Sequence, residues 1–238
     1  MLWDVDLHQE LIGFILCLAG GIAAAMVWVL VRRAVRKRYY HRLDSERERY
    51  RSMVNAIIEG KFEGDLDSLC RRPRTVEWVA IEVSLLEVIE QSSGGQQGRA
   101  TEIFERLGYV DFYLQELEIE IPWRRAMAAQ RLGRMRSTRA TPTLLSALED
   151  KVRDVRQNAM QALGQMRDPQ ALEILVSKLG EAIYHNKNFS RRVLITALIS
   201  YGESAVPLLL GKLLDPSDAV RGLAAEILGE IPNSQALP

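Results

Sequence analysis

The sequence has few of the residues on which most catalytic and metal sites depend. Its 238 residues include two cysteines, Cys17 and Cys70, and three histidines, His8, His41 and His185. Two distant cysteines cannot form a disulfide framework, and none of the five residues has the spacing of a zinc site. Phosphate-binding loops, dinucleotide fingerprints, nucleophile elbows and HExxH motifs are also missing. We therefore expect no catalytic residues, no metal and no other cofactor.

The chain also lacks an excess of charge of either sign. Lys and Arg together number 31, as do Asp and Glu, so the formal net charge is zero. Nucleic-acid binding requires a basic stripe for phosphate contacts, which this composition does not supply in bulk. We therefore expect no nucleic-acid partner. The distribution is nevertheless uneven, because a charge-free run is followed at once by Arg32, Arg33, Arg36, Lys37 and Arg38.

The charge-free run at residues 11–31 predicts a transmembrane helix. At about 1.5 Å per residue, a helix of this length crosses the roughly 30 Å hydrocarbon core of a bilayer. A secretory signal peptide is the alternative, but it begins with basic residues, whereas residues 1–10 contain Asp4, Asp6 and Glu10. The basic cluster after the run places the remainder of the chain in the cytoplasm. We expect a single-pass protein of the cell inner (cytoplasmic) membrane, with residues 1–10 outside.

The predicted span carries small side chains at four-residue intervals, namely Gly13, Cys17, Gly21 and Ala25. Helices in lipid associate by close packing, which small residues permit. This stripe predicts a docking face for another membrane helix, although Gly and Ala are also common in spans without such a role. The basic cluster serves as a topology signal and can in addition contact anionic lipid head groups.

Residues 32–60 carry alternating acidic and basic side chains without an internal glycine or proline before Gly60. This pattern predicts a charged juxtamembrane helix that continues from the span and spaces the following domain from the bilayer.

Beyond Trp123 the sequence repeats itself with a period of 30 to 35 residues. Residues 125–133 align with residues 156–164 and with residues 221–229, and a looser copy occupies residues 191–198. A fixed period of this length predicts stacked helical units, each of which contacts mainly its neighbours. The glycines that close the three clear copies, Gly133, Gly164 and Gly229, are expected to end their helices in the left-handed conformation.

The spacing resembles the short HEAT-like repeat of the type found in phycobilin lyases, in which Asp-x-x-x-x-Val-Arg leads into the second helix of each unit. The resemblance implies an all-α solenoid of antiparallel helix pairs, with degenerate repeats at residues 61–122 and clearer repeats at residues 123–238. It also implies a structural ladder between repeats, formed by Asp150, Arg156, Asp215 and Arg221. Ankyrin repeats have a similar period but require a hairpin that has no counterpart here. The last unit, which begins near Ile231, is expected to stop midway.

Solenoids commonly bind their partners on an extended concave surface. The positions of the second helices that face away from the predicted core are small or polar: Gln130, Gln157, Gln161, Arg192, Thr196 and Glu226. The leading hypothesis is therefore a noncatalytic membrane-anchored scaffold that binds a protein partner at the cytoplasmic face. Membrane-tethered HEAT-like proteins resemble accessory subunits of inner-membrane assemblies such as glycosyltransferase complexes. The alternatives are a HEAT-like-repeat enzyme of the tetrapyrrole lyase type and a structural protein that self-assembles as a homo-oligomer.

Overall fold

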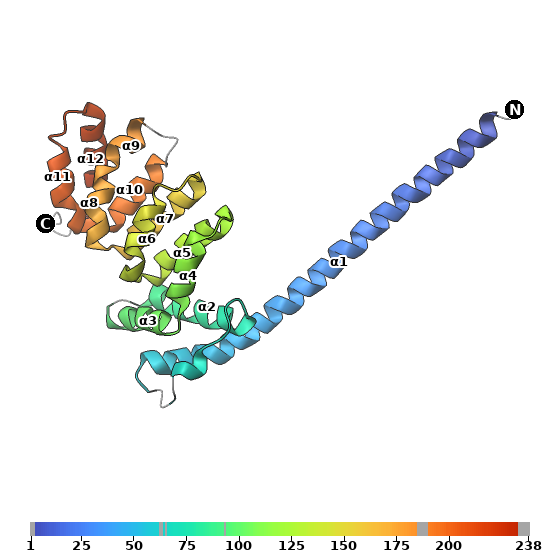
Figure 1. The fold of residues 1–238 in the computed structure, drawn as a ribbon, viewed down its shortest axis with the longest axis horizontal. Helices are drawn as coiled ribbons and strands as arrows, with labels where there is room; N and C mark the ends of the chain where they lie inside the picture. The colour runs from blue at the N-terminus through green and yellow to red at the C-terminus, as the bar shows by residue number, and fades with distance from the viewer. Residues whose placement is uncertain (1–2, 62–63, 65, 93, 185–189, 233–238) are drawn as a thin grey trace.

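The computed structural model describes residues 3–61, 64, 66–92, 94–184 and 190–232. Within these ranges the chain forms twelve α-helices, three short 3-10 helices and no strand, which confirms the predicted all-α fold. Figure 1 shows one long helix, α1, that leaves a curved stack of shorter helices. Residues 233–238, with most of the expected incomplete last unit, lie outside the described residues.

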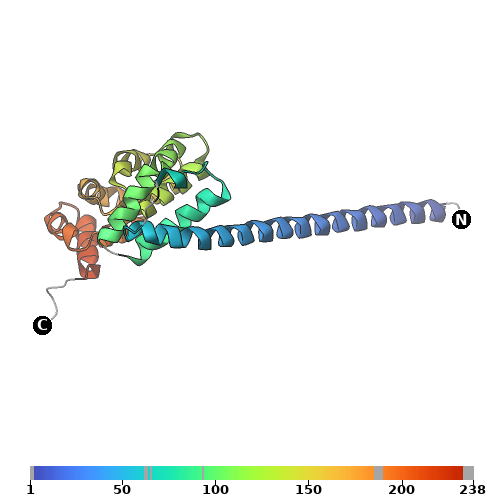
Figure 2. The ribbon, with the colours of Figure 1, turned by 90° about the horizontal axis from the view of Figure 1, so that it is seen from below.

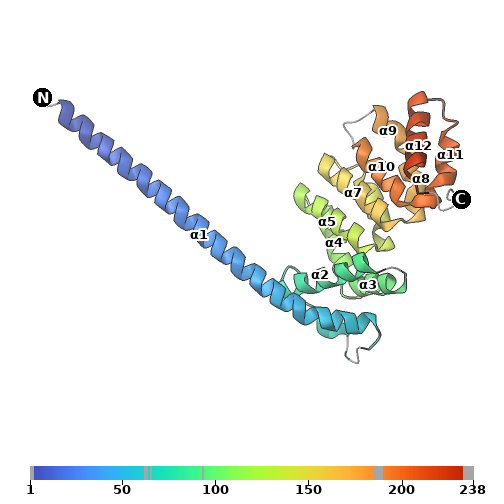
Figure 3. The same cartoon turned by 180° about the vertical axis from the view of Figure 1, so that it is seen from behind.

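Helix α1 (Trp3–Ile58) is continuous over 56 residues, which corresponds to a length of about 84 Å. Its N-terminal part contacts no other helix and is long and apolar enough to cross a membrane. Figure 2 shows the N-terminal part of α1 projecting away from the stack, and Figures 1 and 3 show that the helix curves where it meets the stack. The predicted span and juxtamembrane helix are therefore two parts of one element without an intervening break. The helix ends before Gly60, which has a φ of +74°.

The C-terminal end of α1 belongs to the core of the stack. Tyr50, Val54 and Ile58 lie four residues apart on one face and are buried against α2 (Val76–Gln91). The Arg99 guanidinium donates a hydrogen bond of 2.7 Å to the backbone oxygen of Ile58. The segment predicted to be a spacer thus also carries part of the apolar core, so α1 joins the stack without a flexible linker.

Most of the remaining helices form antiparallel pairs. In order they are α3 (Gly95–Arg106), α4 (Tyr109–Glu118), α5 (Pro122–Met135), α6 (Thr141–Ala147), α7 (Arg153–Met166), α8 (Pro169–Ser177), α9 (Leu179–Tyr184), α10 (Arg191–Ser200), α11 (Val206–Lys212) and α12 (Asp218–Glu230). Helix α4 pairs with α5, α6 with α7, α8 with α10 and α11 with α12. The core between the two layers is apolar, and Leu132, Leu144, Leu163 and Leu194 are completely buried. Each such leucine contributes about 1.5–3 kcal/mol through burial.

Helices within one layer of the stack pack more closely than helices within the other. Helices α5, α7 and α10 pack tightly against one another, whereas α4, α6, α8 and α11 make few contacts among themselves. This difference bends the stack, with the α5–α7–α10 layer on its inner side. Figures 1 and 3 show that this layer faces α1.

The closest helix contacts depend on two glycines for which the sequence predicted another role. Gly133 and Gly164 lie inside α5 and α7, and the left-handed residues that follow these helices are Arg136 and Arg167, with φ of 55° and 56°. A Cβ atom on Gly133 would lie 2.5 Å from the Cα of Ala162. The prediction that these glycines terminate their helices was wrong, because they are required for close approach of the inner helices.

The turn between α2 and α3 is short, although residues 92–98 contain three glycines. Gly94 turns the chain with a φ of +66°, and α3 begins directly afterwards at Gly95. The Gln97 side chain donates a hydrogen bond of 3.0 Å to the backbone oxygen of Ile89 near the end of α2. This side chain satisfies one of the backbone oxygens that the C-terminal end of α2 leaves without a partner inside the helix.

Candidate functional site

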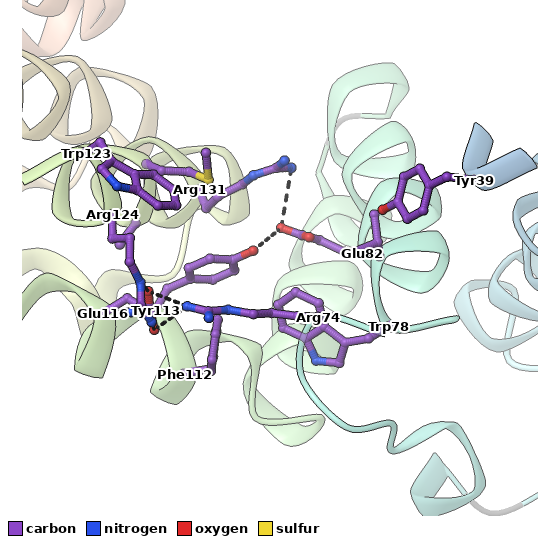
Figure 4. A pocket seen from close by; sticks show the side chains of 13 residues that line it. Tyr39, Arg74, Trp78, Glu82, Phe112, Tyr113, Glu116, Trp123, Arg124 and Arg131 are labelled. Atoms are coloured by element: carbon purple, nitrogen blue, oxygen red, sulfur yellow. Dashed lines mark hydrogen bonds and ion pairs between the residues drawn. The ribbon is translucent and has the colours of Figure 1, made fainter. Parts of the chain in front are cut away.

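A pocket of about 330 Å³ lies where α2, α4 and α5 meet beside α1. Each helix contributes one face, with lining residues spaced one turn apart. The lining comprises Tyr39 from α1, Arg74 from the turn before α2, Trp78, Val79 and Glu82 from α2, Phe112, Tyr113 and Glu116 from α4, and Trp123, Arg124, Met127, Ala128 and Arg131 from α5. Figure 4 shows these side chains converging from the helices onto one space.

Packed aromatic rings form the inner wall of the pocket. The Trp78 ring stacks on Tyr109 at a centroid distance of 4.3 Å and meets the edge of Phe112 at 5.2 Å. The Tyr109 hydroxyl donates a hydrogen bond of 2.8 Å to the backbone oxygen of Trp78. Because Trp78 and Tyr109 are almost completely buried, this wall is rigid.

A carboxylate held by two arginines closes one side of the pocket. Arg74 Nη2 donates to both oxygens of Glu116 at 2.9 and 3.0 Å. Arg124 Nε donates to Glu116 Oε2 at 2.7 Å, and its Nη2 contacts the other oxygen. Burial opposes ionisation of Glu116, but the bonds from Arg124 and Arg74 outweigh this effect and lower its pKa. Arg74, Arg124 and Glu116 together therefore carry one net positive charge.

A second carboxylate, Glu82, lies deeper, with 1% of its surface exposed. The Tyr113 hydroxyl donates a hydrogen bond of 2.9 Å to Glu82 Oε1, and Arg131 Nη1 lies 3.4 Å from the same oxygen. Burial raises the pKa of the Glu82 carboxyl, and the Arg131 charge and the Tyr113 hydrogen bond counteract this rise only in part. Burial, followed by the nearby Glu82 charge, also raises the pKa of Tyr113.

The rim of the pocket is apolar and open to solvent. Trp123 and Met127 lie one turn apart on α5 with 63% and 46% of their surfaces exposed, and Tyr39 of α1 is 41% exposed. Ile121, directly before α5, is 42% exposed. The lining combines aromatic and other apolar side chains with three arginines and two carboxylates.

The small residues predicted for membrane-helix packing lie on the free part of α1. Gly13, Cys17, Gly21 and Ala25 are all exposed, and no other part of the described chain covers the glycines. The basic cluster of Arg32, Arg33, Arg36, Lys37 and Arg38 follows on the same helix and is also exposed. The Arg32 guanidinium lies over the Trp28 ring at 5.2 Å.

The aspartates and arginines predicted to form a ladder make two kinds of contact. Asp150 joins neighbouring repeats, because its carboxylate accepts bonds of 2.8 and 2.9 Å from Arg125. Arg156 instead bonds to the backbone oxygen of Asp150 at 2.6 Å, and Arg221 bonds to that of Asp215 at 2.8 Å. These two arginines close the turn within their own repeat.

The polar positions predicted as a partner surface are distributed over the inner layer. Gln161, Arg192 and Thr196 line a groove of about 290 Å³ between α7 and α10. Glu226 lines a neighbouring hollow together with Arg192 and Thr196, and it pairs with Arg191. Gln130 on α5 is exposed, and Gln157 on α7 is half-buried.

The residues considered for metal or redox chemistry do not gather. Within the described ranges, no three His, Cys, Asp or Glu side chains cluster as a metal site requires. Cys17 and Cys70 are exposed and free, and His41 is exposed on α1. His185 lies outside the described residues.

Two features of the sequence are partial signals for the aromatic pocket. Trp123 is an aromatic residue immediately before the first clear repeat copy at residues 125–133. Glu82 is a charged residue within the apolar run of residues 76–89, an arrangement that favours a buried carboxylate with partners. The remaining lining residues resemble ordinary core and surface positions, so the pocket itself was not predicted.

Comparison with known proteins agrees with the repeat pattern. Residues 110–183 match the family model of HEAT repeats, and no curated protein matches the chain. A similar solved structure is the complex of CpcE and CpcF of phycocyanin lyase from Nostoc sp. PCC7120, with 22% sequence identity and a TM-score of 0.38. The match covers 63% of this chain and 64% of that chain, which is less than two thirds of its length. The family match thus identifies HEAT repeats at residues 110–183.

Proposed function

We propose that this protein is a membrane-anchored adaptor whose HEAT solenoid binds another protein at the cytoplasmic face of the inner membrane. The observation that carries the proposal is the continuity of α1, which joins an exposed apolar stretch to the core of the solenoid without a break. A rigid connection of this kind holds the solenoid at a fixed height above the bilayer.

The charge distribution supports the orientation. The exposed basic cluster at Arg32–Arg38 follows the apolar stretch directly, and residues 1–10 carry three acids and no Lys or Arg. The positive-inside rule therefore places the solenoid in the cytoplasm. The basic side chains would lie at the level of anionic lipid head groups, each worth about 1 kcal/mol near the surface.

Two surfaces are available to a partner. The small-residue stripe of Gly13, Cys17, Gly21 and Ala25 suits a second membrane helix, since no other part of the described chain covers its glycines. The inner layer of the solenoid, with the groove at Gln161, Arg192 and Thr196, suits a cytoplasmic segment. A partner that uses both surfaces is a subunit of a membrane assembly, of which a glycosyltransferase complex is one example.

Cysteine labelling in intact cells tests the anchor and its orientation. In a Cys17→Ser background, a cysteine introduced by His8→Cys should react with a membrane-impermeant maleimide. The exposed native Cys70 should react only after the membrane is opened. Labelling of Cys70 in intact cells would reverse the proposed topology, and recovery of the full chain in the soluble fraction would remove the anchor.

Cross-linking in native membranes, followed by mass spectrometry, tests the adaptor role. The full chain should cross-link to one reproducible protein, and a chain that lacks residues 1–31 serves as the control with reduced recovery. Recovery of the chain alone would contradict the proposal, and recovery only with itself would favour self-assembly. A tetrapyrrole that co-purifies with the full chain would favour the enzyme hypothesis instead.

A further inference from the structure

The pocket beneath Trp123 lies close to the proposed membrane surface. Tyr39 of its lining is eight residues beyond Val31, the last residue of the charge-free run, so it lies about 12 Å further along the continuous helix. The head-group layer adds only about 5–8 Å to each side of the hydrocarbon core. The pocket therefore lies just beyond the head groups. Figures 1 and 3 show the inner layer on the side of the stack that faces α1.

The charges of the pocket favour an anion. Its lining contains three arginines, Arg74, Arg124 and Arg131, and two carboxylates, Glu82 and Glu116. Both carboxylates are almost completely buried and already bonded, whereas 56% of the Arg74 side chain is exposed. The charge that reaches the opening is thus positive. An incoming carboxylate would find an accessible guanidinium.

The shape and rim favour an apolar side chain next to that anion. A volume of about 330 Å³ is at the small end for ligand pockets and suits one or two side chains. Trp123 and Met127 extend the aromatic wall outward, and exposed tryptophan and methionine are common anchors in protein interfaces. Lipid chains do not reach this height, so an apolar rim there would not contact the membrane interior.

We propose that this pocket receives an acidic, aromatic segment of a membrane protein at the point where that partner leaves the bilayer. The aromatic side chain of the segment occupies the space between Trp78 and Trp123, and an adjacent carboxylate pairs with Arg74. This proposal rests on the proposed adaptor function, because it places the occupant in a membrane-bound partner.

Peptide binding to the full chain in phosphatidylcholine nanodiscs tests the chemistry of the pocket. The probes are three fluorescein-labelled peptides, Gly-Glu-Trp-Glu-Gly and its counterparts with Gln or Lys in place of both Glu residues. Fluorescence anisotropy should give the tightest binding for the acidic peptide, by about tenfold over the Gln peptide. Equal binding of the three peptides, or tightest binding of the Lys peptide, would overturn the proposal.

Matched variants locate the binding. Trp123→Ala should weaken binding of the acidic peptide about tenfold. Arg74→Gln should make the protein bind the acidic peptide and the Gln peptide equally well. Arg74 is chosen because Glu116 retains its bonds to Arg124. The controls are Leu214→Ala, at an exposed apolar residue remote from the pocket, and Arg72→Gln, which removes the same charge outside it. Unchanged binding in Trp123→Ala, with a circular dichroism spectrum like that of the parent, would contradict the assignment.

Two further outcomes separate the competing explanations. Displacement of the peptide by dihexanoylphosphatidylglycerol, but not by dihexanoylphosphatidylcholine, would assign the pocket to an anionic lipid and overturn the proposal. If native-membrane cross-linking recovers a partner but the acidic peptide has no preference for the pocket, the pocket proposal fails and the adaptor function stands. If the peptide binds as expected but no partner cross-links, the adaptor function fails instead.

Discussion

Gly164 of α7 lies directly against Ala197 of α10, so that a Cβ atom on Gly164 would be 2.6 Å from the Cα of Ala197. Gly133 has the same relationship to Ala162 one repeat earlier. The inner helices thus contact each other almost backbone to backbone. The spacing of the layer that faces α1 is set by the absence of side chains at these positions.

Gly164→Ala is expected to destabilise the fold by about 1–3 kcal/mol, because the added methyl group overlaps backbone atoms that cannot rotate away. Gly229 of α12 is the matched control, since no atom lies within 4 Å of its would-be Cβ. Gly229→Ala should stabilise the protein by about 0.5–1 kcal/mol through helix propensity. Urea unfolding of the two variants, followed by circular dichroism, should give effects of opposite sign. Equal effects would show that the close contact is not required.

The ion pair between Arg125 and Asp150 should contribute much more to stability than a similar pair on the surface. Arg125 is 6% exposed and also donates to the backbone oxygens of Ile119 and Glu120. Arg125→Met should cost about 2–4 kcal/mol, because it removes the buried guanidinium from Asp150, which keeps only the Val152 N–H, and from the two carbonyl groups. Arg139→Met, which breaks the exposed pair with Asp111, should cost less than about 1 kcal/mol. Similar losses in the two variants would contradict this ranking.

The buried Glu82 should make stability depend on pH above its ordinary pKa of 4.5. Because folding raises the pKa of Glu82, the folded state binds its proton more tightly, and stability decreases as the pH rises from about 4.5 through the raised pKa. Glu82→Gln removes this titration, so its stability relative to the parent should increase over that range. Glu116 and Asp150 have lowered pKa values, so their contribution is lost only as the pH falls below their ordinary values. Parallel stability curves for parent and variant would contradict the prediction.

The small-residue face of α1 should be needed for the membrane partner. Gly21→Leu places a large side chain on the predicted docking face and should lower cross-linking to the partner about tenfold. Ala23→Leu adds a similar volume about 200° further around the helix and should have little effect. The two variants should be compared at equal levels in the membrane. Undiminished cross-linking in Gly21→Leu would remove the docking role of this face.

The repeats could be predicted because they depend on local patterns. The recurrence of Ala128, Ala159 and Ala224 with a following Leu and Gly reports the helical period and the unit length together. The role of the glycines could not be predicted in the same way. Gly133 and Gly164 stand near the ends of their helices in sequence, but the contact that requires them is made by a helix some thirty residues away.

The sequence by itself determined the elements whose cause is local: a charge-free run long enough to span a bilayer, the basic cluster that follows it, and the helical repeats. The tertiary structure decided what depends on contacts between distant segments. It placed Tyr50, Val54 and Ile58 in the core, so the end of α1 is packed into the solenoid. It also gathered Trp78, Tyr113 and Trp123 from three helices around one pocket beside α1. Side chains that lie far apart along the chain line one pocket only because the packing of the helices brings their faces together.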